Sequence, residues 1–271
     1  DEINKKDIRI GDTVLIQRAG DVIPEVIKVI LEQREKPLSR YSLPNICPAC
    51  NSAAIRNKDD AILRCTNVKR CSAQIKGRMK HFVSKNCMDI DGVGDKLIET
   101  LIDNQIIKKY SDIFKLEKSD LEDLERMAEK SINNILNSIN KSKNTELYRF
   151  LNGLGIRNVG IHACKLLERE FGGDINKIAS STEESLNNIH EIGEIMASSI
   201  VKYFKNQDHL YDINECVKYG LTFKRAKRSH EFKNLSFVIT GSFENITRSE
   251  IKKKLEGYGG RVSSSISKKT S

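Results

Sequence analysis

The sequence lacks any long hydrophobic run. No uninterrupted stretch of about 18 apolar residues occurs, and this excludes a transmembrane helix. Residues 1–7 also do not resemble a secretory signal peptide, so we expect a cytoplasmic protein. The chain opens on Asp1 and stops at Ser271 inside an unfinished strand-and-loop pattern, so we expect a fragment of a longer protein.

The cysteines do not form the pattern of a disulfide framework. Seven are present, an odd number, and four of them are crowded between residues 47 and 71. Such crowding predicts a metal site in a reducing compartment. We interpret the scattered Cys87, Cys164 and Cys216 as small core residues.

Acidic residues are outnumbered by basic ones. The chain has 37 Asp and Glu against 46 Lys and Arg, a formal net charge of +9. This balance favours a polyanionic partner such as nucleic acid or an acidic membrane surface, although a merely soluble basic protein is the alternative. With 271 residues, of which 38% are hydrophobic, the chain can bury a core, and we expect several small modules.

Cys47, Cys50, Cys65 and Cys71 have the spacing of a zinc site. Two residues separate the first pair, five separate the second, and fourteen lie between the pairs. Zn²⁺ binds four thiolates tetrahedrally, and two such loops can fold around one ion without a large core. Because four thiolates leave no position for water, the predicted zinc is structural. Buried free thiols are the alternative, but they would not need this clustering.

Residues 76–222 predict a repeating helical array. An apolar residue followed by a tiny one recurs at intervals of 34, 32 and 33 residues: Val93-Gly94, Met127-Ala128, Val159-Gly160 and Ile192-Gly193. Apolar side chains then follow with the spacing of an amphipathic helix. Tetratricopeptide and ankyrin repeats have similar periods, but their signature residues are absent.

The first repeat contains a glycine hairpin, Gly92-Val93-Gly94, directly before its helix. Backbone N–H groups of such a hairpin can approach a phosphate at the positive end of the helix dipole, and Lys96 adds charge. One hairpin alone is more often an ordinary helix connection. Four in register indicate sequence-independent binding to the phosphates of both strands of a duplex. The fourth repeat keeps only one glycine and the second keeps none, so not all four need contact DNA.

The ends of the chain predict further modules. β-Branched residues at 13–17 and 22–30 predict strands of a small β-domain. A basic stretch of Lys224, Arg225, Lys227 and Arg228 precedes a predicted strand at 237–240 and a helix at 248–255. We interpret the basic stretch as a solvated linker, with DNA contact as the alternative.

Taken in order, these features resemble the C-terminal half of bacterial NAD⁺-dependent DNA ligases over essentially all 271 positions. Arg18-Ala19-Gly20-Asp21-Val22-Ile23-Pro24 is similar to the end of the family's OB-fold domain, and the four-cysteine finger follows. Met88-Asp89-Ile90-Asp91-Gly92 and Leu154-Gly155-Ile156-Arg157 resemble parts of its helix-hairpin-helix units. Thr240-Gly241-Ser242 and Gly259-Gly260 resemble the start of its BRCT domain.

The resemblance implies a multidomain, mainly α chain. The expected parts are a partial OB β-barrel (1–38), a small four-cysteine zinc finger (42–75), a four-unit helix-hairpin-helix array (76–222), a basic linker (223–231) and a truncated α/β BRCT domain (232–271).

The resemblance also implies a function. The whole enzyme would seal 3′-hydroxyl/5′-phosphate nicks in duplex DNA during replication and repair: NAD⁺ adenylates a lysine, AMP passes to the 5′-phosphate, and the 3′-hydroxyl attacks. That lysine belongs to a Lys-x-Asp-Gly motif, which this sequence lacks, since Asp89 stands in the lysine position of Asp89-Ile90-Asp91-Gly92. We therefore expect no catalytic residue here, and a chain that clamps DNA but is inactive alone.

The partners follow from the same resemblance. Zn²⁺ would bind here, whereas NAD⁺ and Mg²⁺ or Mn²⁺ would bind mainly outside this chain. We expect a monomer that binds nicked double-stranded DNA without sequence preference, associates with the nucleoid and has no membrane partner. A non-enzymatic DNA-repair scaffold is the alternative function, and a protein-binding helical repeat without DNA affinity is a third.

Candidate DNA-binding residues come from the β-domain and the hairpins. They are Arg18, Gly92, Gly94, Lys96, Lys130, Arg157, Gly160 and Gly193. Thr240 and Gly241 are a weaker candidate phosphate site in the BRCT part, with strand-end packing as the alternative. For Arg18, the alternative is a solvated charge on a strand.

Overall fold

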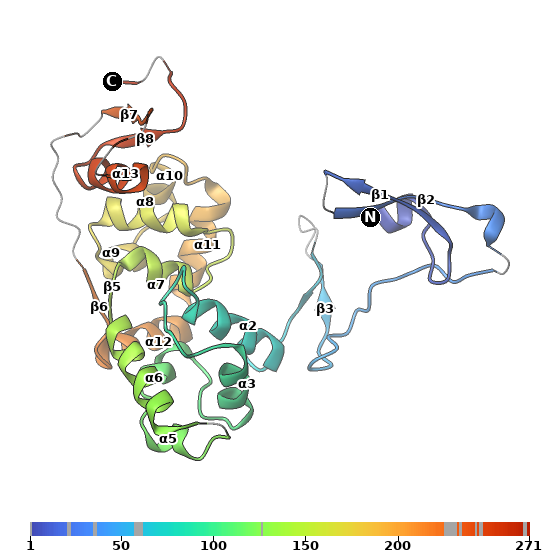
Figure 1. The fold of residues 1–271 in the computed structure, drawn as a ribbon, viewed down its shortest axis with the longest axis horizontal. Coiled ribbons are helices and arrows are strands. Elements are labelled where there is room, and N and C mark those ends of the chain that lie inside the picture. Colours follow the sequence, from blue (N-terminus) through green and yellow to red (C-terminus); the bar gives the residue numbers. More distant parts are fainter. Residues whose placement is uncertain are drawn as a thin grey trace. The chain divides into compact units, whose positions relative to one another are not determined.

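The computed structural model describes residues 2–20, 23–34, 37–56, 62–125, 127–224, 232, 235–241, 243, 246–267 and 270–271. The chain divides into two compact units, Asp1–Cys71 and Ser72–Ser271, which are considered separately (Figure 1). Most of the predicted basic linker (225–231), together with Asp21, Val22 and Ser242 of the family-like motifs, lies outside the described residues.

The first unit is built from two small antiparallel sheets. A short helix α1 (Glu2–Lys5) precedes β1 (Val14–Ala19), which pairs with β2 (Ile23–Val29), and the 3₁₀ helix η1 (Leu31–Gln33) follows. The second sheet pairs β3 (Ala54–Ile55) with β4 (Arg64–Cys65). Both strands expected from the β-branched runs are therefore present.

Charged side chains fix the ends of the first hairpin. The Arg34 guanidinium donates to Asp12 at 2.7 Å and to Asp7 at 2.8 Å, and the backbone N–H of Arg9 donates to Asp12 at 2.7 Å. The Asp12 side chain is almost fully covered, and its hydrogen bonds from Arg34 hold its pKa below the ordinary value. Because a covered carboxylate is stable only when paired, this network orders the segment around Arg34.

The second unit is predominantly helical. Its helices up to residue 218 are α2 (Ser72–Val83), α3 (Asp95–Asp103), α4 (Tyr110–Ile113), α5 (Ser119–Glu122), α6 (Glu129–Ser142), α7 (Leu147–Gly153), α8 (Ile161–Phe171), α9 (Ile175–Ala179), α10 (Glu183–Asn187), α11 (Glu194–Lys205) and α12 (Gln207–Lys218). A short parallel pair of β5 (Asn144–Thr145) and β6 (Thr222–Phe223) joins two distant segments. None of the helices in the described part of the chain is both long and apolar enough to cross a membrane.

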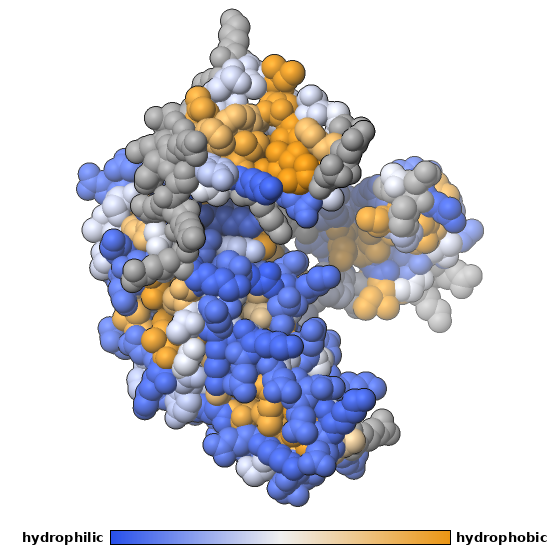
Figure 2. Space-filling view, turned by 60° about the vertical axis from the view of Figure 1, so that its left-hand side comes forward, coloured by the Kyte–Doolittle hydropathy of each residue, from blue (hydrophilic) through white to orange (hydrophobic). Residues whose placement is uncertain are grey.

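One apolar core runs through these helices. Phe82 stacks on Tyr110, with 4.6 Å between ring centroids, and meets Phe150 edge-on at 6.0 Å. The predicted apolar stripes turn inward, whereas hydrophilic side chains cover much of the visible surface and hydrophobic ones form separate patches (Figure 2). Cys87, Cys164 and Cys216 are fully buried, which confirms their assignment to the core. Burial raises the pKa of Cys164 to about 12.

A buried carboxylate connects two helices that are far apart in sequence. Asp212 of α12 accepts hydrogen bonds from the backbone N–H groups of Tyr110 and Ser111, at 3.0 and 2.9 Å, at the start of α4. The first N–H groups of a helix have no partner within the helix, so Asp212 satisfies two of them. This contact fixes the short helix α4 against α12.

The C-terminal segment forms a β-α-β arrangement. β7 (Ser236–Val238) pairs in parallel with β8 (Arg261–Ser263), and α13 (Arg248–Gly257) connects them, which confirms the expected strand and helix. A Cβ atom at Gly260 would lie 2.7 Å from the ring of Phe237. Glycine is therefore required where the chain re-enters the sheet.

Candidate zinc site and nucleic-acid interface

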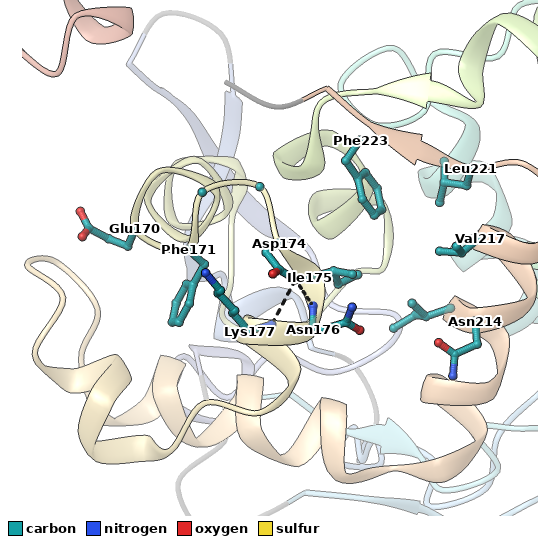
Figure 3. Close-up of a pocket in the computed structure, with 13 residues that line it drawn as sticks. Glu170, Phe171, Asp174, Ile175, Asn176, Lys177, Asn214, Val217, Leu221 and Phe223 are labelled. Atoms are coloured by element: carbon teal, nitrogen blue, oxygen red, sulfur yellow. Dashed lines mark hydrogen bonds between the residues drawn. The ribbon is translucent and has the colours of Figure 1, made fainter. Parts of the chain in front are cut away.

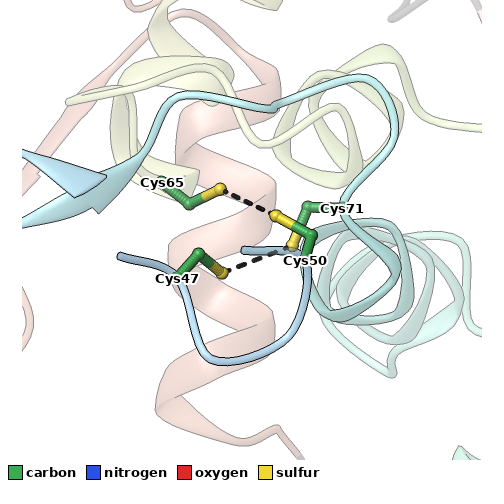
Figure 4. Close-up of side chains that lie close together, drawn as sticks. All are labelled: Cys47, Cys50, Cys65 and Cys71. Atoms are coloured by element: carbon green, nitrogen blue, oxygen red, sulfur yellow. Dashed lines mark hydrogen bonds between the residues drawn. The ribbon is translucent and has the colours of Figure 1, made fainter. Parts of the chain in front are cut away.

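The four clustered cysteines converge in the first unit. Their Sγ atoms all lie within 4.8 Å of one another (Figure 4). The Cys47 and Cys71 Sγ atoms are 3.9 Å apart, and those of Cys50 and Cys65 are 3.4 Å apart. Tetrahedral thiolates at about 2.3 Å from zinc are separated by roughly 3.8 Å, so the set fits a four-thiolate zinc site.

The local backbone explains this convergence. The N–H of Asn51 donates to the carbonyl of Cys47 at 2.9 Å, and the N–H of Cys47 donates to the carbonyl of Ser52 at 2.8 Å. Asn51 has a left-handed backbone with φ 56°, which closes the turn that holds Cys47 and Cys50 together. Cys65 comes from β4, and Cys71 directly precedes α2.

The thiols differ in acidity. Hydrogen bonding with Ser52 lowers the pKa of Cys50 to about 6, whereas burial raises the pKa of Cys65 to about 11. Metal binding requires deprotonated thiols, so a bound Zn²⁺ would hold both as thiolates. The donor set is thus chemically suited to a structural zinc.

Four turns of similar backbone shape precede helices of the second unit. We call them hairpin 1 (92–94, before α3), hairpin 2 (127–128, before α6), hairpin 3 (158–160, before α8) and hairpin 4 (191–193, before α11). Their helix N-caps share φ between −80° and −92° and an extended ψ: Gly94, Ala128, Gly160 and Gly193. Two residues before the N-cap, φ is positive in hairpins 1, 3 and 4, at Gly92, Asn158 and Glu191. The predicted register of four repeats is therefore present.

The N-cap glycines leave open space. A Cβ atom at Gly94, Gly160 or Gly193 would meet no other atom within 4 Å, and their φ values suit any residue, as Ala128 illustrates. Packing within the protein therefore does not require glycine at these three positions. What glycine does provide there is room for an external group close to the backbone.

Gly92 has a different explanation. Its φ is +84°, and a Cβ atom there would lie 2.9 Å from Ile135 Cγ1. Turn geometry and packing against α6 thus account for this glycine without any ligand. Its predicted contact with DNA stays a prediction.

The hairpin helices have no side-chain cap, a feature that they share with α4, α5 and α7. α3, α6, α8 and α11 have no side-chain hydrogen bond from their N-cap residue. By contrast, the N-caps of four other helices accept first-turn N–H bonds: Asp174 for α9, Thr182 for α10, Asn206 for α12 and Thr247 for α13. Uncapped first-turn N–H groups favour an external anion, so the four hairpins have the geometry of phosphate sites.

Two lysines earlier in the chain, Lys80 in α2 and Lys118 directly before α5, pair with the acidic residues of the first two hairpin helices. Lys80 Nζ lies 3.2 Å from an Asp95 carboxylate oxygen, and Lys118 Nζ lies 3.0 Å from one of Glu129. These carboxylates would otherwise repel a phosphate at the helix start. Lys80 and Lys118 could not be recognised from the sequence pattern, because neither belongs to a hairpin motif.

The remaining candidate residues are distributed over both units. Lys96 and Lys130 are exposed in the first turns of α3 and α6, and Arg157 is exposed directly before hairpin 3. Arg18 is exposed on β1, where it pairs with Pro24 of β2, so the structure does not group it with the hairpins. Their roles in binding DNA stay predictions.

Thr240 and Gly241 follow β7 in the C-terminal segment. Gly241 has φ 82°, and its carbonyl accepts two hydrogen bonds from the Arg248 guanidinium, at 2.9 and 2.7 Å. These bonds connect the end of the strand to the start of α13. They favour the packing alternative over a phosphate site.

A pocket that the sequence analysis did not foresee lies between the end of α8, α9, α12 and β6. It has a volume of about 800 Å³ and a mixed lining that includes Phe171, Val217 and Phe223 (Figure 3). Its carboxylate Asp174 accepts the N–H groups of Asn176 and Lys177, at 3.0 and 3.4 Å. The Asp174 carboxylate is already used to cap α9, so it does not indicate a ligand, and we assign none to the pocket.

These observations define a class: a multidomain protein that combines a four-cysteine zinc-finger site with an array of helix-hairpin-helix units. Sequence models of four families match the chain. They are the NAD-dependent DNA ligase OB-fold domain (1–37), the NAD-dependent DNA ligase C4 zinc finger domain (47–73), the helix-hairpin-helix motif (149–212) and the BRCA1 C Terminus (BRCT) domain (227–271).

Curated relatives agree with these domains. Proteins named DNA ligase match the whole chain with 46% identity over 279 residues in Listeria monocytogenes, 44% over 277 in Lysinibacillus sphaericus and 40% over 275 in Clostridioides difficile. The chain spans 40% to 41% of the length of these relatives. In its domains and their order, the chain matches part of the NAD-dependent DNA ligases. The domain boundaries given in the sequence analysis stay predictions.

Proposed function

We propose that this chain is the DNA-clamping part of an NAD⁺-dependent DNA ligase that seals 3′-hydroxyl/5′-phosphate nicks in duplex DNA during replication and repair. The observation that carries the proposal is the set of four uncapped hairpin helices, whose small N-caps leave the first-turn backbone open. The net charge of +9 suits a polyanion, and the relatives are named DNA ligase.

The hairpins would bind DNA through its backbone. N–H groups at Gly94 and Gly160 would donate to phosphate oxygens, and Lys96 and Lys130 would add positive charge in the first turns of their helices. Contacts to phosphates carry no sequence information, so the clamp would accept any duplex sequence. Each neutralised phosphate releases counterions, so affinity would fall steeply with salt.

Cys47, Cys50, Cys65 and Cys71 would hold a structural Zn²⁺ in the first unit. The ion would supply a cross-link between two loops and no reaction chemistry, because four thiolates complete its coordination. Arg18, in the same unit, would contribute a phosphate contact.

In the proposed reaction, the chain contributes alignment. The sequence contains no Lys-x-Asp-Gly motif, so the adenylated lysine, and with it most contacts to NAD⁺ and Mg²⁺ or Mn²⁺, would belong to the rest of the enzyme. Holding the 3′-hydroxyl and the activated 5′-phosphate in line lowers the barrier by several kcal/mol in well-oriented systems. We propose that the protein acts as a monomer on the nucleoid in the bacterial cytoplasm.

A non-enzymatic DNA-repair scaffold is the second candidate. The absence of a Lys-x-Asp-Gly motif from the sequence favours it, because a zinc finger, the hairpins and a BRCT segment would suffice to recruit partners to DNA.

Two measurements test the proposal. The zinc-loaded chain is titrated against fluorescent nicked and intact duplexes at several salt concentrations, and nick sealing is assayed with NAD⁺. We expect salt-dependent binding without sealing; a chain that does not bind at low salt, or that seals nicks alone, contradicts the proposal.

The second measurement separates ligase from scaffold. The corresponding segment of the Listeria monocytogenes relative is replaced by this chain, and the chimera is assayed for sealing. We expect sealing to be retained in the chimera and lost when Gly94 and Gly160 are both changed to Asp. A folded chimera that binds DNA but never seals favours the scaffold.

A further inference from the structure

The four hairpin helices differ at the second residue of the helix. This position is occupied by Lys96, Lys130, His162 and Ile195 in hairpins 1 to 4. Hairpins 1 and 2 present an exposed lysine, and hairpin 3 presents an imidazole whose side chain is 72% exposed. Hairpin 4 presents an apolar side chain, and Ile195 is also 72% exposed. The repeats are therefore not equivalent as phosphate sites.

Hairpin 4 also carries an acidic residue at the helix start. Glu194 is the first residue of α11, and within the described residues no ion pair with it is present. Asp95 and Glu129 have lysine partners at the same position, and α8 has Ile161 there. A phosphate at hairpin 4 would face an unbalanced carboxylate and an isoleucine, whereas hairpin 3 has no first-turn carboxylate.

A side chain from hairpin 4 instead contacts hairpin 3. Glu191 Oε2 lies 2.5 Å from His162 Nε2, and its other carboxylate oxygen lies 3.4 Å from Nδ1 of the neighbouring His190. A second bond connects the same two repeats, because the Asn158 side-chain amide donates to Ser199 Oγ at 3.4 Å. Hairpins 3 and 4 thus form a joined pair.

The contact with Glu191 occupies one of the two ring nitrogens of His162, namely Nε2. An imidazole that carries both protons has two N–H donors, so it can bond a carboxylate and a phosphate oxygen at the same time. In that form Nδ1–H of His162 would be the donor to the phosphate. The hydrogen bond from His162 lowers the pKa of Glu191, so the carboxylate stays ionised at neutral pH.

We infer that His162 is a DNA-phosphate-binding residue of hairpin 3, and that Glu191 is its positioning residue, so hairpin 4 supports hairpin 3 instead of binding a phosphate itself. This inference rests on the proposed function, namely that the array binds duplex DNA. It assigns different roles to two repeats that share one backbone shape.

The experiment measures affinity for a nicked duplex as a function of salt, using the full chain with zinc bound. We expect His162→Ala to weaken binding about 3- to 10-fold and to reduce the salt slope by about 0.9, the loss of one phosphate contact. His162→Lys restores both quantities. Glu191→Gln weakens binding in the parent chain. In the His162→Lys background the same change has no effect on binding, because lysine is charged without a carboxylate partner.

Two controls separate this inference from the proposed function. Ile195→Ala, at the equivalent position of hairpin 4, should bind as the parent does, and Lys96→Ala should weaken binding through hairpin 1. Wild-type affinity of His162→Ala, alongside weakened Lys96→Ala, overturns the inference and leaves the proposed function standing. If the parent chain does not bind DNA, both the proposed function and this inference are wrong. Circular dichroism checks that each variant is folded.

Discussion

The two units of this chain are ordered by different forces. Apart from Cys47 and Cys71, the buried apolar side chains of the described residues lie between Met79 and Leu221, in the helical unit. In the first unit, Ile10, Ile16 and Ile23 are exposed. A segment that buries so little apolar surface cannot offset its chain entropy by the hydrophobic effect alone. We therefore expect metal binding and charge contacts to order the described part of the first unit.

The largest expected effect is therefore the loss of zinc. Chelation, or Cys71→Ser, should unfold the region around the cysteine cluster, because structural zinc binding contributes about 10–16 kcal/mol in finger peptides. The helical unit should keep its helicity, since its core contains none of the four thiols. Limited proteolysis and far-UV circular dichroism measure the two effects.

A cysteine outside the cluster provides the control for zinc loss. Cys87→Ala should retain one zinc per chain, because Cys87 is buried in the helical core. If chelation lowers the melting temperature of the helical signal, the two units are not ordered independently.

The next largest effect should follow from a truncation of the helical core. Phe150 is fully buried and lies 6.0 Å from the Phe82 ring and 5.4 Å from the Phe223 ring. Phe150→Ala should destabilise the helical unit by about 3–5 kcal/mol through lost burial and a cavity. Thermal unfolding measures the loss, and zinc content should stay unchanged. Phe150→Leu, which leaves a smaller cavity, should destabilise less; equal losses would mean that packing is not the cause.

Much of this organisation was predictable from sequence because it is local. The cysteine spacing predicted the cluster, since short loops fix where the thiols can meet. The periodic apolar residues and the tiny N-cap residues predicted α3, α6, α8 and α11, because amphipathic periodicity and helix starts are encoded within one turn or two.

Contacts between distant segments were not predictable. Asp212 satisfies N–H groups about one hundred residues earlier in sequence, and Glu191 reaches His162 from another repeat. No local spacing encodes such pairs, because they depend on how helices pack. Gly92 shows that a local motif can also predict too much. Its motif predicted a contact with a ligand, but packing against Ile135 is enough to explain the glycine.

A smaller effect should separate stability from DNA binding within the helical unit. Gly160→Asp should stabilise α8 by a few tenths of a kcal/mol, because aspartate is a better N-cap than glycine. The same carboxylate should occupy the open first-turn N–H groups and repel phosphate, so DNA affinity should fall. Thermal unfolding measures the expected rise in stability, and DNA titration measures the expected fall in affinity. Gly77→Asp, within α2 rather than at a hairpin, should not reproduce this combination, and a stabilised variant with undiminished affinity would contradict the phosphate role of hairpin 3.

The smallest expected effect is a difference in how acid acts on the two units. Burial lowers the pKa of His209 below its ordinary value of 6.5, and its ring stacks on Tyr203 with 4.1 Å between centroids. As pH falls below that ordinary value, the unfolded chain takes up a proton that the folded chain resists, so the helical unit should lose stability. Above pH 6.5, His209 is neutral in both the folded and the unfolded chain, so this loss of stability is absent.

The first unit should not share this response. The pKa values of Asp7 and Asp12 are lowered from about 3.8, so the stability that their ion pairs contribute is lost only in stronger acid. Melting of the helical signal between pH 7.5 and pH 5.5 is therefore compared in the parent and in His209→Gln, which keeps a donor for the Tyr203 carbonyl. The decrease in melting temperature should be smaller in the variant. An equal decrease would assign the acid response to other groups, because the substitution removes the titrating imidazole and leaves the rest of the core in place.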